Sequence, residues 1–194
     1  MGTDDPRSDP RLIAALRRIA PGTELRQGLN DITRGHLGAL IVIGEPAELQ
    51  FLFSGGLQLD QPFTSQYLYE LAKMDGAIVL NQNATRIVCA NVQLMPDPTI
   101  PSAETGTRHR TAERVARQTG ALVISISQSR DTLSVYVGSM RYQLEAIADV
   151  LAKTNQALDT LETYRSRLDQ VSSRLTALEF QHAVTLDDVL VVLQ

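Results

Sequence analysis

Cysteine and long apolar runs are scarce in this sequence, and each scarcity excludes a class of protein. The 194 residues include one cysteine, Cys89, so a disulfide framework within the chain is impossible. Cys89 lies in the apolar run "RIVCANVQL", which indicates an inert thiol in the core. No stretch approaches the roughly 20 apolar residues of a membrane span, and the polar start "MGTDDPRSDP" is unlike a secretory signal. These features predict a cytoplasmic protein without a membrane segment.

Charge and the missing motifs narrow the function classes further. The formal net charge is −4, which argues against a broad nucleic-acid-binding surface. The sequence contains no Walker A pattern, no G-x-G-x-x-G, no H-E-x-x-H and no nucleophile elbow. Any phosphate site in this chain is therefore not a P-loop.

Hydrophobic periodicity predicts an α/β fold with a mixed central β-sheet flanked by helices. Apolar residues at helical spacing predict helices near 12–19, 25–32, 64–74 and 111–119, the last ending at Gly120. Short runs rich in Val, Ile and Leu predict strands at 38–44, 49–56, 76–81, 86–95, 121–127 and 132–138. Several of these runs are apolar at consecutive positions, which is typical of strands covered on both faces.

The last quarter of the chain has a different character. No glycine or proline occurs from Ser139 to Gln194, and apolar residues recur every three or four positions. This pattern predicts a globular domain at 1–143 and a long helical segment at 144–194, whose stripe packs either on the domain or on another copy. The chain ends inside the apolar run "VLVVLQ", so we expect more protein to follow. The stripe comprises Leu161, Tyr164, Leu168, Val171, Leu175 and Leu178, continued with a phase slip by Leu144, Ile147, Leu151 and Leu158.

A cluster of positive charge stands out in "ETGTRHRTAERVARQTG", residues 104–120. A loop enters a helix here, and a helix N-terminus offers unpaired N–H groups to an anion. Arginine forks and hydroxyl groups added to it favour a polyanion such as a triphosphate. The alternative is a solvated basic helix face, which we expect for Arg114 and Arg117. Like charge on both sides of His109 disfavours its protonated form, so it could donate one hydrogen bond while neutral.

The second candidate is "KMDGAIVL", where Asp75 lies at the junction of a helix and a strand. A carboxylate at such an edge can bind a hard cation together with substrate phosphates. Gly76 would allow a ligand to come close to the backbone. The alternative is a simple turn, because Asp-Gly is a common turn dipeptide.

The two features together resemble the diadenylate cyclase domain family, in particular its DNA-integrity scanning (DisA) members. That family is marked by a DGA and an RHR motif, matched here by Asp75-Gly76-Ala77 and by "SAETGTRHRTAERVA". The resemblance extends over nearly the whole chain from about residue 10. It implies an enzyme that joins two ATP molecules into cyclic di-AMP and releases two pyrophosphates.

The resemblance also implies roles for individual residues. Asp75 would lie at the 3′-hydroxyl and bind Mg²⁺ or Mn²⁺, while Leu94 would contact adenine through its backbone. Ser127 would touch a phosphate, although the following "QSRD" departs from the more basic pair expected there. The implied catalytic residues are Asp75, Arg108, His109 and Arg110, and the implied ATP-binding set adds Gly76, Ala77, Leu94, Thr107, Thr111 and Ser127.

Assembly and partners follow from the same resemblance. It implies a homo-octamer with active sites face to face, and DNA binding only through a C-terminal helix-hairpin-helix domain that these residues do not contain. Two alternatives stay open. One is a catalytically silent sensor of ATP or cyclic di-AMP, and the other is a DNA-binding or scaffold protein.

Overall fold

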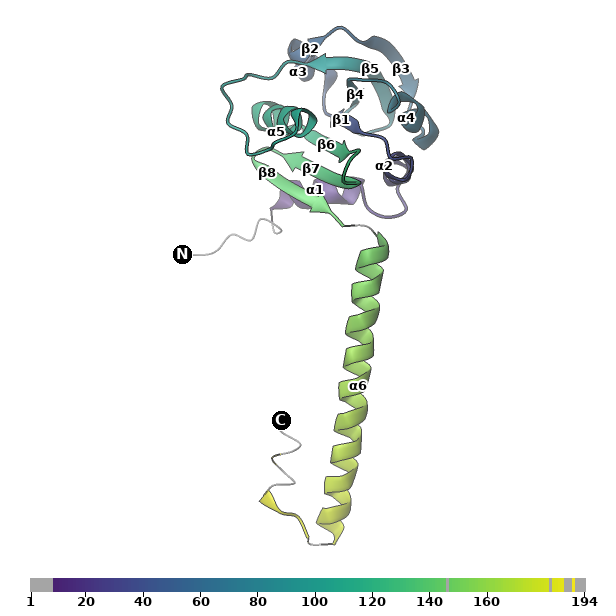
Figure 1. The fold of residues 1–194 in the computed structure, drawn as a ribbon, viewed down its shortest axis with the longest axis vertical. Helices are drawn as coiled ribbons and strands as arrows, with labels where there is room; N and C mark the ends of the chain where they lie inside the picture. The colour runs from purple at the N-terminus through teal and green to yellow at the C-terminus, as the bar shows by residue number, and fades with distance from the viewer. Residues whose placement is uncertain (1–8, 146, 182, 187–189, 191–194) are drawn as a thin grey trace. The chain divides into compact units, whose positions relative to one another are not determined.

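The computed structural model describes residues 9–145, 147–181, 183–186 and 190. The chain divides into two compact units after Leu144. The first unit is a mixed β-sheet with helices on both faces, and the second contains one long helix (Figure 1). This architecture confirms the predicted fold class.

The sheet has eight strands in the order β2-β5-β4-β1-β6-β7-β8, with β3 also pairing with β5. Strands β1 and β4 are parallel, with Leu40 beside Ala77, and every other pair among the described strands is antiparallel. Their bounds are β1 Ala39–Ile43, β2 Phe53–Ser54, β3 Leu57–Pro62, β4 Ala77–Leu80, β5 Arg86–Leu94, β6 Leu122–Ser127, β7 Thr132–Val137 and β8 Met140–Leu144.

The apolar side chains of the sheet form one core on each face. In β1, Leu40 and Val42 face one core while Ile41 and Ile43 face the other, because successive side chains of a strand alternate. Helices α1 (Pro10–Arg18), α2 (Glu24–Arg34) and α4 (Ser65–Leu71) cover the first face. Helices α3 (Pro46–Leu49) and α5 (Thr107–Thr119) cover the second. Figure 1 shows α5 and α1 on opposite sides of the sheet.

Three local predictions differ from the structure. The run 49–56 is not one strand, because α3, a 3₁₀ turn at Gln50–Leu52 and the short β2 replace it. Leu49 and Leu52 are both buried, a helical spacing that was hidden by the Phe residues between and after them. Strand β3 was missed because "LQLDQP" is mostly polar and exposed. Strand β8 was missed because Leu144, which pairs with Leu133, was assigned to the helical stripe.

The second unit contains α6, Ile147–Phe180, which confirms the predicted long helix. Its stripe residues Leu158, Leu161, Tyr164 and Leu168 are exposed in the single chain. Among the described helices, none is both long and apolar enough to cross a membrane.

A tight approach between two backbones shapes the sheet edge at the start of β4. Gly76 has a φ of +91°, and a Cβ there would lie 2.8 Å from the carbonyl carbon of Asn91. Asn91 itself has a φ of +54°, and the β4–β5 register shifts between Ala77 and Val79. This bulge directs β5 past Gly76, so the close neighbour of this glycine is the protein's own strand, where the sequence predicted a ligand.

We expect Gly76→Ala to destabilise the fold more than Gly120→Ala. Gly120, the C-cap of α5, also has a positive φ of +72°, but a Cβ there would meet nothing within 4 Å. An L-residue in this region costs roughly 1–2 kcal/mol, so Gly120→Ala measures that cost alone. Urea unfolding of both variants makes the comparison, and equal losses of stability would refute the steric role of the bulge.

Candidate functional site

A hollow of about 590 Å³ opens at the sheet edge where β1 and β4 begin and β5 ends. Because β1 and β4 are parallel and β5 is antiparallel, two strand beginnings and one strand end meet there. Helix α5 begins at the same edge. The lining residues are Leu40, Ser54, Gly55, Gly56, Asp75, Gly76, Ala77, Asn91, Val92, Gln93, Leu94, Thr107, Arg108 and Thr111.

The hollow unites most residues that the sequence singled out. The DGA motif lies on one wall and the start of α5 on another, although 31 positions separate Gly76 from Thr107 in the numbering. Asp75 is exposed and supplies the only carboxylate among the described lining residues, and Arg108 supplies the only cation. The site thus offers one negative and one positive group to a ligand in the same hollow.

Arg108 lies across the start of β1. Its guanidinium fills the space that a side chain at position 38 would occupy, so Gly38 makes this position of the arginine possible. Sequence reasoning missed Gly38, because nothing local connects it with a residue so far along the chain.

The first turn of α5 is open to an anion. Its N-cap is Gly106, which makes no side-chain cap hydrogen bond, so the first amide groups have no side-chain acceptor. The helix begins at Thr107, four residues before the predicted start, and the RHR motif therefore lies inside the first turn. The end at Gly120 is as predicted.

Three predicted site residues do not line the hollow. His109 is half-buried and turns toward the sheet, where its Nδ1 lies 2.9 Å from the Tyr136 hydroxyl. Arg110 is exposed, and its guanidinium lies 3.4 Å from the carbonyl oxygens of Glu104 and Thr105. Ser127 is buried at the end of β6, with its Oγ 3.4 Å from that of Ser129. Their roles toward a nucleotide stay predictions.

The environment of His109 lowers the pKa of its imidazole. Burial is the main cause, and the positive charges of Arg141, Arg130 and Arg108 add to it, while Glu104 acts in the opposite direction. The predicted direction is confirmed, but desolvation outweighs the like-charge effect that suggested it. Burial, followed by the hydrogen bond to Glu104, raises the pKa of Tyr136.

Arg114 and Arg117 do not form a solvated face, contrary to the interpretation of their sequence. Arg114 Nε donates to the Ile100 carbonyl at 2.9 Å, and Arg117 Nη1 donates to the Pro101 carbonyl at 3.0 Å. Glu113 is buried, accepts from Ser102 Oγ at 2.5 Å and pairs with Arg117 at 2.6 Å. Together they attach the loop before α5 to the helix and fix the approach to the hollow.

The site could accept a cation only as part of a complex. No group of three or more His, Cys, Asp or Glu side chains with metal-binding geometry occurs in the described part of the chain. Asp75 can supply one oxygen ligand, and Mg²⁺ commonly binds one or two carboxylates together with substrate phosphates. The donor set therefore fits a divalent cation that arrives with a polyphosphate.

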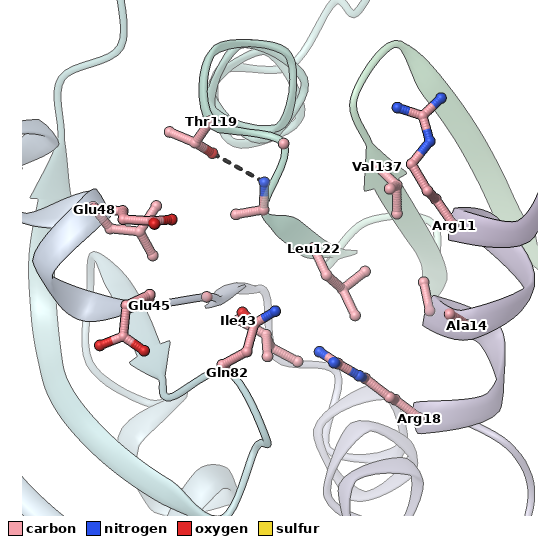
Figure 2. A pocket seen from close by; sticks show the side chains of 15 residues that line it. Arg11, Ala14, Arg18, Ile43, Glu45, Glu48, Gln82, Thr119, Leu122 and Val137 are labelled. Atoms are coloured by element: carbon pink, nitrogen blue, oxygen red, sulfur yellow. Dashed lines mark hydrogen bonds between the residues drawn. The ribbon is translucent and has the colours of Figure 1, made fainter.

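A second, smaller hollow of about 220 Å³ lies at the opposite edge of the sheet, beside α1 (Figure 2). Arg11 and Arg18 lie on the α1 side, and Glu45 and Glu48 lie across from them. The charges of these four side chains balance, but Thr119 and Gly120 also line this hollow, at the C-terminal end of α5. The negative end of the helix dipole disfavours a triphosphate there, whereas the hollow near Asp75 lies at the positive end.

Sequence reasoning also missed one wall of the hollow that contains Asp75 and Arg108. Gly55 and Gly56 form the turn between β2 and β3, both with positive φ, and Asn91 and Gln93 come from β5. The sequence signal for this turn was the pair of glycines that follows the apolar run 49–54. The run and both glycines had been predicted as one strand, 49–56.

Comparison with protein families places this fold and site in a class. Residues 26–140 match the DAC family, described as "DisA bacterial checkpoint controller nucleotide-binding". Residues 144–194 match the "DisA bacterial checkpoint controller linker region". The first unit is thus a DAC-type nucleotide-binding domain, and the chain belongs to the DisA family.

Curated relatives agree with this family. A DNA integrity scanning protein DisA from Carboxydothermus hydrogenoformans is 53% identical over 186 residues, which are 96% of this chain and 53% of the relative. A protein of the same name from Symbiobacterium thermophilum is 56% identical over 179 residues, 92% of this chain and 51% of the relative. The chain thus spans about half the length of the curated relatives it matches.

Two solved structures share the fold alone. A hypothetical membrane spanning protein from Bacillus cereus is 24% identical with a TM-score of 0.56, over 63% of this chain and 62% of that one. DacA from Staphylococcus aureus is 20% identical with a TM-score of 0.53, over 75% of this chain and 97% of that one.

The lowered pKa of His109 predicts a pH dependence of stability. Its ordinary value is 6.5, so the unfolded chain takes up this proton more readily than the folded one. The stability of the wild type should fall as pH drops through 6.5, and the loss should stop growing below the folded-state pKa. His109→Asn retains a hydrogen-bond donor near Nδ1 but cannot titrate. Urea unfolding of both proteins at a series of pH values should give diverging curves below neutral pH, and parallel curves would contradict the assignment.

Proposed function

We propose that this chain is a diadenylate cyclase, a nucleotidyltransferase that condenses two ATP molecules into cyclic di-AMP and releases two pyrophosphates. The observation that carries the proposal is the placement of Asp75 and Arg108 in the lining of one hollow, together with the open first turn of α5. Membership of the DisA family supports the same reaction.

The walls of the hollow suggest how ATP binds. The Leu94 backbone would contact adenine, and Asp75, with the adjoining Gly76 and Ala77, would face the ribose 3′-hydroxyl. Thr107, Arg108 and Thr111 would contact the ribose and the phosphates from the start of α5. In each of the two steps, a 3′-oxygen forms a bond to the α-phosphorus of the other ATP, loses its proton and displaces pyrophosphate.

Catalysis here depends on positioning and on charge. Phosphoryl and nucleotidyl transfer needs aligned reactants and a neutralised phosphate more than a protein nucleophile. Arg108 and the first-turn amides stabilise the charge on the phosphate, while the Asp75 carboxylate favours the developing 3′-alkoxide. Mg²⁺ or Mn²⁺, bound by Asp75 and by ATP oxygens, would supply further charge neutralisation.

The reaction requires two copies of the chain. One hollow places one ATP, yet each ATP must present its 3′-hydroxyl to the α-phosphate of the other. Two copies about a two-fold axis satisfy this requirement through an isologous interface. The exposed stripe of α6 offers a second, helix-to-helix contact that can build larger assemblies, and we propose an octamer. DNA binding would then belong to the part of the protein outside these residues.

A silent nucleotide sensor is the weaker alternative. A sensor needs to bind the phosphates and the base, but it has no use for a carboxylate facing the ribose 3′ edge. Asp75 is exposed and lines the hollow, available to a reacting group.

The wild-type chain should convert ATP to cyclic di-AMP in the presence of Mg²⁺ or Mn²⁺, as measured by chromatography of the products. Asp75→Asn retains the shape of the side chain but removes its charge, so turnover should disappear while circular dichroism stays unchanged. Activity within about tenfold of wild type, a barrier difference of only ~1.4 kcal/mol, would show that Asp75 is not the key carboxylate. ATP binding by the wild type without any cyclic product would favour the sensor.

Mixed assemblies of Asp75→Asn and Arg108→Ala subunits should make a product that neither variant makes alone. In a mixed pair, the Arg108→Ala subunit retains Asp75 and can present a 3′-hydroxyl. Its partner retains Arg108 and can bind the receiving phosphate, so the first bond can form and the second cannot. Co-expressed variants should therefore accumulate the linear dinucleotide triphosphate with one pyrophosphate released. A product yield equal to the sum of the two separate variants would contradict the face-to-face arrangement.

A further inference from the structure

A chain of three polar contacts lies behind the first turn of α5, outside the nucleotide hollow. His109 Nδ1 lies 2.9 Å from the Tyr136 hydroxyl, and that hydroxyl lies 2.9 Å from Glu104 Oε1. Arg141 Nε on β8 lies 2.9 Å from the same carboxylate oxygen. Tyr136, on β7, is only 1% exposed, and the Arg141 side chain is 47% exposed, so this network runs from the core beneath α5 to the surface.

The direction of these hydrogen bonds determines where the imidazole proton lies. The Glu104 carboxylate, paired with Arg141, can only accept, so the single proton of the Tyr136 hydroxyl points toward Glu104. The tyrosine oxygen must then accept from His109, and Nδ1 must carry a hydrogen. Since the pKa of His109 is lowered and the ring is neutral near pH 7, Nε2 is left without a proton.

The free side of the ring lies at the beginning of α5. A Cβ added at Gly106, the N-cap, would be 3.7 Å from His109 Cδ2, the carbon bonded to Nε2. The charges of Arg108 and Arg130 also act on this ring. Nε2 therefore belongs to the edge of the imidazole next to the open helix terminus, where positive charge is concentrated.

The face of the sheet beneath α5 carries polar side chains around Tyr136, where apolar side chains would pack equally well. Ser134 lies two residues before Tyr136 on the same face of β7, and Ser125 is its cross-strand partner on β6. The Ser125 hydroxyl is buried without a hydrogen-bond partner among the described residues, while the buried Ser134 hydroxyl acts on Tyr136 and lowers its pKa slightly against the larger effects that raise it. A phenylalanine at position 136 would fill the same space in the core. The tyrosine hydroxyl therefore contributes through its hydrogen bonds.

We propose that Tyr136 and Glu104 are positioning residues for the nucleotide site, which fix His109 with its proton on Nδ1 and keep Nε2 free for the triphosphate. This inference rests on the proposed ATP site and extends it to two residues outside the hollow. When a triphosphate enters, its negative charge favours protonation of the ring, and a solvent proton can enter only at Nε2. Nε2–H then donates to a phosphate oxygen, while Nδ1–H remains on Tyr136 and Glu104 stabilises the imidazolium.

The tautomer can be measured without any nucleotide. The sequence has three histidines, so imidazole ¹⁵N spectra are simple to assign with His36→Gln and His182→Gln variants. Wild-type protein near pH 7.5 should show a protonated Nδ1 and an unprotonated Nε2 for His109. Tyr136→Phe should shift His109 toward the opposite tautomer. A protonated Nε2 in the wild type, or an unchanged tautomer in Tyr136→Phe, overturns the proposal.

Kinetics give the second readout, with a matched control. Tyr142 lies on β8 beside Val135, and its hydroxyl has no hydrogen-bond partner within the described ranges, so Tyr142→Phe makes the same chemical change without touching the network. By analogy with residues that orient metal-ligating histidines, Tyr136→Phe should lower kcat/KM for ATP roughly 10–100-fold, and Tyr142→Phe should leave it unchanged. Equal kcat/KM in the two variants refutes the positioning role.

A second variant covers the case in which Tyr136→Phe does not fold. Glu104→Leu retains a side chain of similar size but cannot accept from the Tyr136 hydroxyl, so the tyrosine proton can turn toward His109. The His109 tautomer should shift as in Tyr136→Phe, and an unchanged ¹⁵N spectrum counts against the proposal. Because the spectra need no turnover, an inactive wild type would disprove the cyclase function while the tautomer still decides the positioning claim.

Discussion

The parallel pairing of β1 with β4 is the constraint on which the site depends. It places the beginnings of both strands at one edge, where Leu40 lies beside Ala77. The antiparallel neighbours β5 and β6 then end at that same edge. Asp75, two residues before β4, and Leu94, which ends β5, therefore line the same hollow without any long-range loop. An all-antiparallel order of β1 and β4 would send Asp75 to the far edge, beside the second hollow.

Two glycines, which have no side chain to block a close contact, allow the two halves of the site to come together. Gly76 lets the bulged β5 pass at contact distance, and Gly38 leaves the space in which the Arg108 guanidinium lies. The buried Glu113 binds the loop before α5, so the helix starts at a fixed place relative to the sheet. The charged groups are thus positioned by backbone geometry and by hydrogen bonds beneath them, which suits a reaction governed by alignment.

Local patterns predicted the central part of the fold and one half of the site. Strands such as β1 and β6 were predictable because every position in them is buried and all are apolar except Ser125 and Ser127 in β6. Asp75 and Arg108 were predictable because each lies in a short motif with its own chemistry. The mostly polar β3, by contrast, is fixed by its pairing with β5, which no local pattern reveals.

The residues that support the site were missed for the same reason. Glu104, Tyr136 and Arg141 meet only in the folded chain, and each alone resembles an ordinary loop or strand residue. Arg114 and Arg117 have the spacing of a solvated helix face, yet they bond to carbonyl groups of a loop 14 and 16 residues earlier. Contacts of this kind depend on tertiary structure, and hydrophobic periodicity carries no information about them.

A crystal structure with 3′-deoxy-ATP and Mg²⁺ tests the central claim most directly, because this analogue binds but cannot react. The account predicts the nucleotide in the hollow between Asp75 and Arg108, with the ribose 3′ edge toward Asp75. The triphosphate should lie at the first turn of α5, within hydrogen-bond distance of Arg108, and a second copy should face it across a two-fold axis. A nucleotide bound beside α1, between Arg18 and Glu45, or one whose triphosphate points away from α5, would contradict the account.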